Sequence, residues 1–176
     1  MDKRKEANLK VKKQIADALF ELMREKKFCD ITVTEMITAA KVARVSFYRN
    51  FDSKEGVLTW LIEDILQSFL GDEDHASINY MSYEHVKKCF LYFKKYGRYV
   101  LDLYRSEFAT VLLDELNTFH EAVAGNMPAK SATRYSVYMY MGALFNSAIK
   151  WLECGAEESI EDIAAVFCKT AGISIE

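Results

Sequence analysis

The sequence predicts an all-α protein of about nine helices, and three observations support this fold class. One proline and 7 glycines among 176 residues leave too few turn signals for a many-stranded sandwich or barrel. Apolar residues recur three and four positions apart through most of the chain, which is the spacing of one helix face. A content of 51% hydrophobic and 28% charged residues is typical of a folded chain and excludes an intrinsically disordered one.

Three helices are predicted in the first third of the chain. The first spans residues 5–26, where apolar side chains form one stripe and lysines occupy the outer side. The second is short and begins after Thr32, an N-cap residue that forms a capping box with Glu35. After a turn of a few residues, residues 44–51 form another short helix, so the pair is predicted to be a helix-turn-helix.

The rest of the chain is predicted to form six further helices, separated by short connections. A break at residues 125–130, which include the single proline, Pro128, precedes the last two of them. The predicted ranges are 54–70, 82–95, 98–104, 106–124, 131–153 and 159–171.

The charge is divided between two parts of the chain. Residues 1–54 contain 13 Lys and Arg against 8 Asp and Glu, whereas residues 55–176 contain 10 against 18. The net charge of -3 is therefore an average over a basic part and an acidic part. A basic first part attracts phosphate backbones, so the two parts are expected to differ in function.

Residues 31–58, ITVTEMITAAKVARVSFYRNFDSKEGVL, closely resemble the DNA-binding signature of the TetR family of transcriptional regulators. The run FYRNFDSKE at residues 47–55 is the most specific part of this match. The resemblance implies two domains: a helix-turn-helix DNA-binding domain at residues 1–54 and a helical-bundle domain for ligand sensing and dimerisation at residues 55–176. It further implies a sequence-specific regulator, in the family's common mode a ligand-responsive repressor, although activation stays open.

The second short helix is predicted to present its first side chains to the major groove. Arg44 would fork onto guanine, Val45 would meet a thymine methyl, and Ser46 would reach a base or a phosphate. The side chain of Arg49 would face either the backbone or a base.

Tyr48, Asn50 and Lys54 match family positions that contact the sugar–phosphate backbone of DNA. Lys54 also lies beside the N-terminus of the next helix, which favours a phosphate. Thr32 and Thr34 open the first helix of the helix-turn-helix, and their hydroxyls or nearby amides would hold a second phosphate. The predicted DNA-binding residues are Thr32, Thr34, Arg44, Val45, Ser46, Tyr48, Arg49, Asn50 and Lys54.

Two residues depart from the family pattern. Lys41 occupies the turn position that is usually glycine, which costs about 1 kcal/mol if the backbone there is left-handed. Ala43 replaces the Ser or Thr that usually caps the recognition helix, at a further cost of about 1 kcal/mol. Both changes lower local stability and leave the family resemblance intact.

Aromatic residues are concentrated in the acidic part, with 15 of the 23 lying between Tyr80 and Trp151. This density suits an apolar ligand cavity with a few hydroxyls, and the family holds its inducer pocket in this region. For each single aromatic, packing in the bundle core is the competing interpretation. The candidate ligand-binding residues are Tyr92, Tyr96, Phe108, Tyr138, Met141 and Phe145.

Residues 138–163 resemble, more loosely, the last two helices of a C-terminal domain type common among Gram-positive members of the family. The resemblance implies a homodimer formed through these two helices. A two-fold dimer reads two half-sites of a palindromic operator, which gives more specificity than one short helix. The operator, the small-molecule effector and the number of dimers per operator cannot be derived from the sequence.

Several other classes of protein are disfavoured. No HExxH, GxSxG or glycine-rich phosphate loop occurs, so no enzyme is expected. The four cysteines are far apart and form no CxxC pair, so we expect no metal site, no cofactor and no disulfide. With no membrane segment or signal peptide, the protein is expected to be cytoplasmic. The remaining alternative is a helical adaptor or sensor of the same fold that binds a protein partner in place of DNA.

Overall fold

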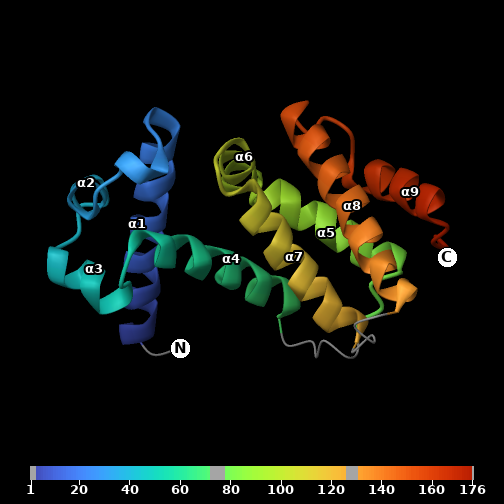
Figure 1. Cartoon of the computed structure of the whole chain (residues 1–176), viewed down its shortest axis with the longest axis horizontal. Coiled ribbons are helices and arrows are strands. Elements are labelled where there is room, and N and C mark those ends of the chain that lie inside the picture. Colours follow the sequence, from blue (N-terminus) through green and yellow to red (C-terminus); the bar gives the residue numbers. More distant parts are fainter. Residues whose placement is uncertain (1–2, 72–77, 126–130, 176) are drawn as a thin grey trace. The chain divides into compact units, whose positions relative to one another are not determined.

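The computed structural model describes residues 3–71, 78–125 and 131–175, and all regular structure in these residues is helical (Figure 1). Nine α-helices occur in the described residues, so the all-α prediction is confirmed. The chain divides into two compact units, Met1–Ile65 and Leu66–Glu176. The division falls inside the helix α4, and the functional boundary between residues 54 and 55 stays a prediction.

The first unit begins with α1 (Lys3–Glu25), a short 3₁₀ helix η1 (Phe28–Asp30), α2 (Val33–Ala39) and α3 (Arg44–Asn50), and continues into α4 (Lys54–Leu70). α1 packs against both α2 and α3. The predicted boundaries differ from these by one or two residues. The fully buried side chains of this unit are Ile15, Leu19, Phe20, Met36, Phe47 and Val57.

The second unit holds α5 (Tyr83–Lys95), α6 (Gly97–Arg105), α7 (Ala109–Ala124), the 3₁₀ helix η3 (Ala132–Arg134), α8 (Tyr135–Glu153) and α9 (Ile160–Ala171). α7 begins three residues later than predicted because Ser106 and Phe108 form a turn before it. The predicted helix at 131–153 begins with η3, which Ser131 caps. Most of the predicted break at 125–130, including Pro128, lies outside the described residues.

The second unit is a helical bundle in which α5 packs on α9 and α7 lies beside α8 (Figure 1). Phe90 is fully buried, and its ring meets the Trp151 ring edge to face at 5.7 Å and the Phe167 ring at 6.2 Å. Aromatic pairs in this geometry contribute about 0.5–1.5 kcal/mol beyond their buried area, so they fix how the helices pack. None of the described helices is both long enough and apolar enough to cross a membrane.

Candidate nucleic-acid interface

The turn between α2 and α3 is closed by the hydrogen bonds of a Schellman motif. The amide of Lys41 donates to the carbonyl of Thr38 at 3.2 Å, and that of Val42 donates to the carbonyl of Ile37 at 3.0 Å. Lys41 has a φ of 54°, the left-handed conformation that glycine adopts without steric cost. The turn therefore forms despite the lysine, and the cost of about 1 kcal/mol given for a left-handed residue other than glycine applies at Lys41.

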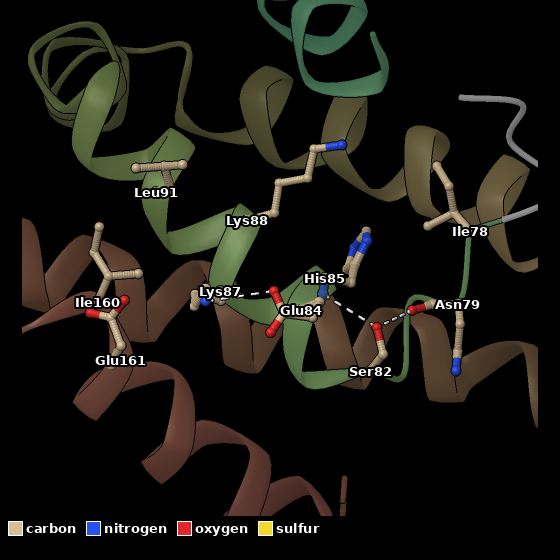
Figure 2. Close-up of a pocket in the computed structure, with 10 residues that line it drawn as sticks. All are labelled: Ile78, Asn79, Ser82, Glu84, His85, Lys87, Lys88, Leu91, Ile160 and Glu161. Atoms are coloured by element: carbon tan, nitrogen blue, oxygen red, sulfur yellow. Dashed lines mark hydrogen bonds and ion pairs between the residues drawn. The ribbon is translucent and has the colours of Figure 1, made fainter. Parts of the chain in front are cut away.

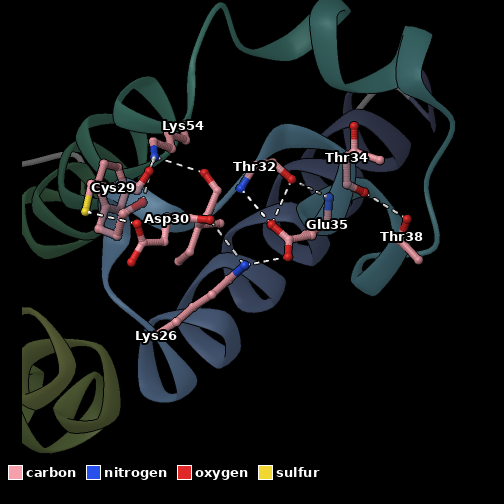
Figure 3. A network of polar contacts seen from close by, with 10 residues as sticks. Lys26, Cys29, Asp30, Thr32, Thr34, Glu35, Thr38 and Lys54 are labelled. Atoms are coloured by element: carbon pink, nitrogen blue, oxygen red, sulfur yellow. Dashed lines mark hydrogen bonds and ion pairs between the residues drawn. The ribbon is translucent and has the colours of Figure 1, made fainter.

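The start of α2 is fixed by the predicted capping box (Figure 3). The amide of Glu35 donates to the Thr32 hydroxyl at 3.2 Å, and the Thr32 amide donates to the Glu35 carboxylate at 2.9 Å. The same carboxylate accepts from the Lys26 ammonium and the Thr32 hydroxyl, and these bonds lower the pKa of Glu35 to about 2. The Thr32 hydroxyl is therefore already used inside the protein as both donor and acceptor.

The outer face of α3 is formed by Arg44, Val45, Tyr48 and Arg49, which are all exposed. Their spacing of one, three and one residues places them on one side of the helix. The exposed fraction is 64% for Val45 and 50% for Tyr48, which is high for side chains of this size. The opposite side is buried through Phe47 and Phe51, whose ring centroids lie 6.0 Å apart.

Arg44 is held between two other predicted DNA-binding residues. Its Nη1 donates to the Thr34 hydroxyl at 3.3 Å, its Nη2 donates to the Tyr48 hydroxyl at 3.4 Å, and its guanidinium carbon lies 5.5 Å from the centre of the Tyr48 ring. These contacts join the first turn of α2 to the outer face of α3. The resulting group of Thr34, Arg44, Val45, Tyr48 and Arg49 is called the α3 face below.

Asn50 and Ser46 lie away from the α3 face. Asn50 Nδ2 donates to the Ser46 carbonyl at 2.8 Å, and its Oδ1 is buried without a hydrogen-bond partner among the described residues. The Ser46 side chain is only half-exposed. The structure therefore does not bring these two residues together with the other five.

Lys54, at the first position of α4, is bound inside the unit. Its ammonium donates to the carbonyls of Phe28 at 2.6 Å, Ile31 at 2.9 Å and Cys29 at 3.1 Å, and it lies 4.5 Å from the centre of the Phe28 ring (Figure 3). The three bonds use all three N–H groups of the ammonium. Lys54 therefore ties the start of α4 to the connection between α1 and α2, a role that no local sequence pattern indicates.

The candidate ligand-binding aromatics have different surroundings in the described part of the chain. Tyr92 and Tyr96 lie together, with ring centroids 5.8 Å apart and the Lys95 ammonium about 5 Å from both rings. The Tyr92 hydroxyl donates to the Ser68 carbonyl at 2.6 Å. Both tyrosines of this pair are half-buried, and the other four residues belong to different groups.

Those four residues are held by packing and by one polar group. The Tyr138 hydroxyl donates to the Glu121 carboxylate, which also accepts from Arg134 at 2.8 Å, so α7 is joined to the start of α8. Met141 is fully buried, Phe145 packs on two aromatic rings, and Phe108 is the half-buried residue before α7. Their role in binding a ligand stays a prediction.

The fold and this geometry can be compared with known proteins. No family model matches the chain. A stretch of 60 residues is 32% identical to the HTH-type dhaKLM operon transcriptional activator DhaS of Lactococcus lactis subsp. lactis (strain IL1403), and covers 34% of this chain and 32% of that protein.

Two solved structures are similar over almost the whole chain. One is a TetR transcriptional regulator from Streptococcus agalactiae 2603V, with a TM-score of 0.64 and 19% identity over 96% of this chain and 97% of that one. The other is the dihydroxyacetone kinase operon activator DhaS, with a TM-score of 0.58 and 17% identity over 92% of this chain and 93% of that one. The resemblance in the signature over residues 31–58 thus extends to the whole fold, and the chain has the fold of the TetR transcriptional regulators.

Proposed function

We propose that the chain is a DNA-binding transcriptional regulator that reads a palindromic operator as a homodimer, with the α3 face in the major groove. The observation that supports this most directly is the exposure of Arg44, Val45, Tyr48 and Arg49 on one side of a short helix whose other side is buried. An arginine fork, an apolar side chain and a phenol are groups that recognise base edges and phosphates.

The orientation of Arg44 adds detail to this proposal. Its guanidinium is positioned by Thr34 and Tyr48, so less side-chain entropy is lost when it pairs with a guanine. We expect Arg44→Ala to abolish preference for one base in each half-site, and Arg44→Lys to weaken that preference, because an ammonium lacks the planar fork that Thr34 and Tyr48 orient.

The dimer is proposed to form through α8 and α9. Between these helices lies a groove of about 420 Å³ with a largely apolar lining that includes Ala143 and Ile163. Beside it Met139 and Val166 are 73% and 62% exposed, which is costly for a lone chain in water. A second copy packing its own α8 and α9 here would bury both side chains in a four-helix bundle.

The dimer is tested by light scattering on Met139→Glu. This variant should behave as a monomer at concentrations where the parent chain is a dimer. The control is Val111→Glu, which places the same charge on an exposed apolar residue of α7 outside the groove. A dimer that withstands Met139→Glu would place the interface elsewhere.

DNA recognition is tested by recovering bound duplexes from a random pool at moderate salt. A regulator enriches a palindrome with half-sites about one helical turn, or a multiple of it, apart. Lys13→Ala, an exposed substitution on α1, should enrich the same palindrome. No enrichment by a folded dimer would refute the proposal.

The direction of regulation and the adaptor alternative remain open within this proposal. The sequence analysis expects repression, whereas the relative that matches over 60 residues is named an activator. A protein-binding adaptor of the same fold gains support from two predicted DNA contacts: the Asn50 amide bonds the Ser46 carbonyl and the Lys54 ammonium bonds the Phe28 carbonyl, so both are used inside the protein. Such an adaptor would fold and dimerise normally and fail in the duplex selection.

A further inference from the structure

Three side chains able to bind a metal ion converge in the interior of the second unit. His85 and Cys89 are four residues apart on α5, and His120 lies on α7; all three are buried. One nitrogen or sulfur atom of each lies within 4.8 Å of the others. The set is called the His–Cys cluster below. Figure 2 shows His85 in the first turn of α5, where its backbone amide donates to the hydroxyl of the N-cap residue Ser82.

We propose that the His–Cys cluster is a binding site for a tetrahedral, borderline-soft transition-metal ion of the Zn²⁺ class, with His85, Cys89 and His120 as its protein ligands. Two imidazoles and one thiolate are a donor set typical of zinc, with the fourth position left to a water or another ligand. The proposal concerns metal binding alone and does not depend on whether the chain binds DNA.

The distances fit such an ion closely. His85 Nε2 and His120 Nε2 are 3.3 Å apart. Two nitrogens bound tetrahedrally at about 2.0–2.1 Å from zinc are separated by about 3.4 Å. The Cys89 sulfur, at most 4.8 Å away, has to come to about 3.6 Å from each nitrogen, a shift of about 1 Å at the end of one side chain.

The second ring nitrogen of His120 is fixed in the way that metal ligands usually are. His120 Nδ1 lies 3.0 Å from the Leu116 carbonyl, one helical turn earlier, and a carbonyl can only accept. The proton is therefore on Nδ1, which leaves the lone pair of Nε2 directed at His85. This backbone contact orients the ring before any ion arrives.

The surroundings favour the neutral, metal-binding form of the two histidines. Burial lowers the pKa of His85 to about 3 and that of His120 to about 4, so both imidazoles are neutral. Burial raises the pKa of Cys89, while the nearby Lys88 ammonium acts to lower it. A bound cation would stabilise the Cys89 thiolate and release its proton.

A buried hydroxyl and a surface pocket complete the site. Tyr140 packs its ring against His120 at 5.9 Å, and its hydroxyl is buried with no hydrogen-bond partner among the described residues. This hydroxyl is a candidate partner for a water bound to the ion. His85 also lines a pocket of about 640 Å³ between α5 and the start of α9, which offers an ion a route inward (Figure 2).

The test is a Co²⁺ titration of the full chain carrying Cys29→Ser and Cys154→Ser, which removes the two exposed thiols. We expect one ion per chain, the visible absorption of tetrahedral Co²⁺ and a thiolate-to-metal charge-transfer band. Zn²⁺ should displace the bound Co²⁺. Added to the metal-free chain at pH 7.5, Zn²⁺ should raise the melting temperature and release one proton per chain, and a chelator should reverse the rise in melting temperature.

The variants separate a metal site from a hydrogen-bonded core. Cys89→Ala should abolish the charge-transfer band and the proton release, and His120→Gln should weaken Zn²⁺ binding by about 100-fold or more. Cys168→Ala, which removes the other buried cysteine, should leave both signals unchanged. The parent protein tests the proposal even if a variant unfolds. If it shows normal helical circular dichroism and no charge-transfer band at one equivalent of Co²⁺, the proposal is overturned. A charge-transfer band that persists in folded Cys89→Ala also overturns it.

Discussion

Replacing Lys54 by methionine is expected to destabilise the first unit by about 2 kcal/mol. The ammonium donates to three backbone carbonyls at 2.6, 2.9 and 3.1 Å, two of them partly buried. A hydrogen bond from a charged donor contributes about 1.5–3 kcal/mol, and because the three bonds share one ammonium that water solvates when they break, the net loss is set near that of a single such bond. Methionine has a side chain of similar length without the ammonium, so the loss reports the ammonium and its contact with the Phe28 ring.

Urea unfolding followed by the fluorescence of Trp60 measures this loss. Trp60 lies in the first unit, where its ring centre is 5.7 Å from that of Phe51, and Trp151→Phe removes the only other tryptophan. A destabilisation of about 2 kcal/mol lowers the urea midpoint by about 1–2 M. Lys54→Arg should lie between parent and Lys54→Met, since a planar fork cannot direct a donor at all three carbonyls.

The control is Lys13→Met, which removes a surface lysine whose ammonium is 4.0 Å from a carboxylate. Its midpoint should match that of the parent. Equal midpoints for the two methionine variants would refute the structural role of Lys54. The salt dependence of DNA affinity in Lys54→Met tests the phosphate contact predicted from the sequence. If Lys54 is bonded only inside the protein, the slope of log affinity against log salt concentration is unchanged. If Lys54 contacts a phosphate, the magnitude of that slope falls by about 0.9.

Three further changes test the helix-turn-helix. Lys41→Gly should stabilise the first unit by about 1 kcal/mol in the same urea assay, because glycine adopts a φ of 54° without strain; a lower midpoint would contradict this. Ala43→Ser should add about 1 kcal/mol by capping α3 and slow amide exchange in its first turn, which unchanged exchange would disprove. The pKa of Glu35 is lowered to about 2 in the folded state, so its contribution to the free energy of unfolding is complete above pH 4.5 and is lost as the pH falls toward 2. Glu35→Gln should flatten the plot of unfolding free energy against pH in that window. Parallel plots for the parent and the variant would refute this prediction.

Helix positions were predictable because their signals are local. Apolar residues three or four apart placed each helix, and N-cap residues such as Thr32, Ser82 and Ser159 mark where helices start. The position of the turn at Lys41 was predicted, whereas its left-handed φ of 54° is seen only in the structure, where hydrogen bonds close the turn. The spacing of apolar residues does not distinguish the turn at Ser106–Phe108 from the first turn of a helix, because apolar residues lie three or four positions apart across both.

The site was less predictable because its decisive contacts join distant residues. Lys54 binds carbonyls 23 to 26 residues earlier, and His120 meets its partner 35 residues away. No metal site was expected from the sequence, because the four cysteines form no CxxC pair, and no local pattern brings His120 of α7 to His85 and Cys89 of α5. A ligand cavity was expected from the density of aromatic residues and from the resemblance, and the role of these residues in binding a ligand stays a prediction.

The position of α3 depends on tertiary contacts, and this explains why the signature can tolerate its two departures. A seven-residue helix with no side-chain cap and a strained residue before it would not form alone. Burial of Phe47 and Phe51 contributes about 1.5–3 kcal/mol for each ring, which exceeds the roughly 1 kcal/mol lost at each of Lys41 and Ala43. The aromatic residues Phe47 and Phe51 of the signature are therefore required for packing, whereas Tyr48 and Arg49 between them are exposed and are not needed for it.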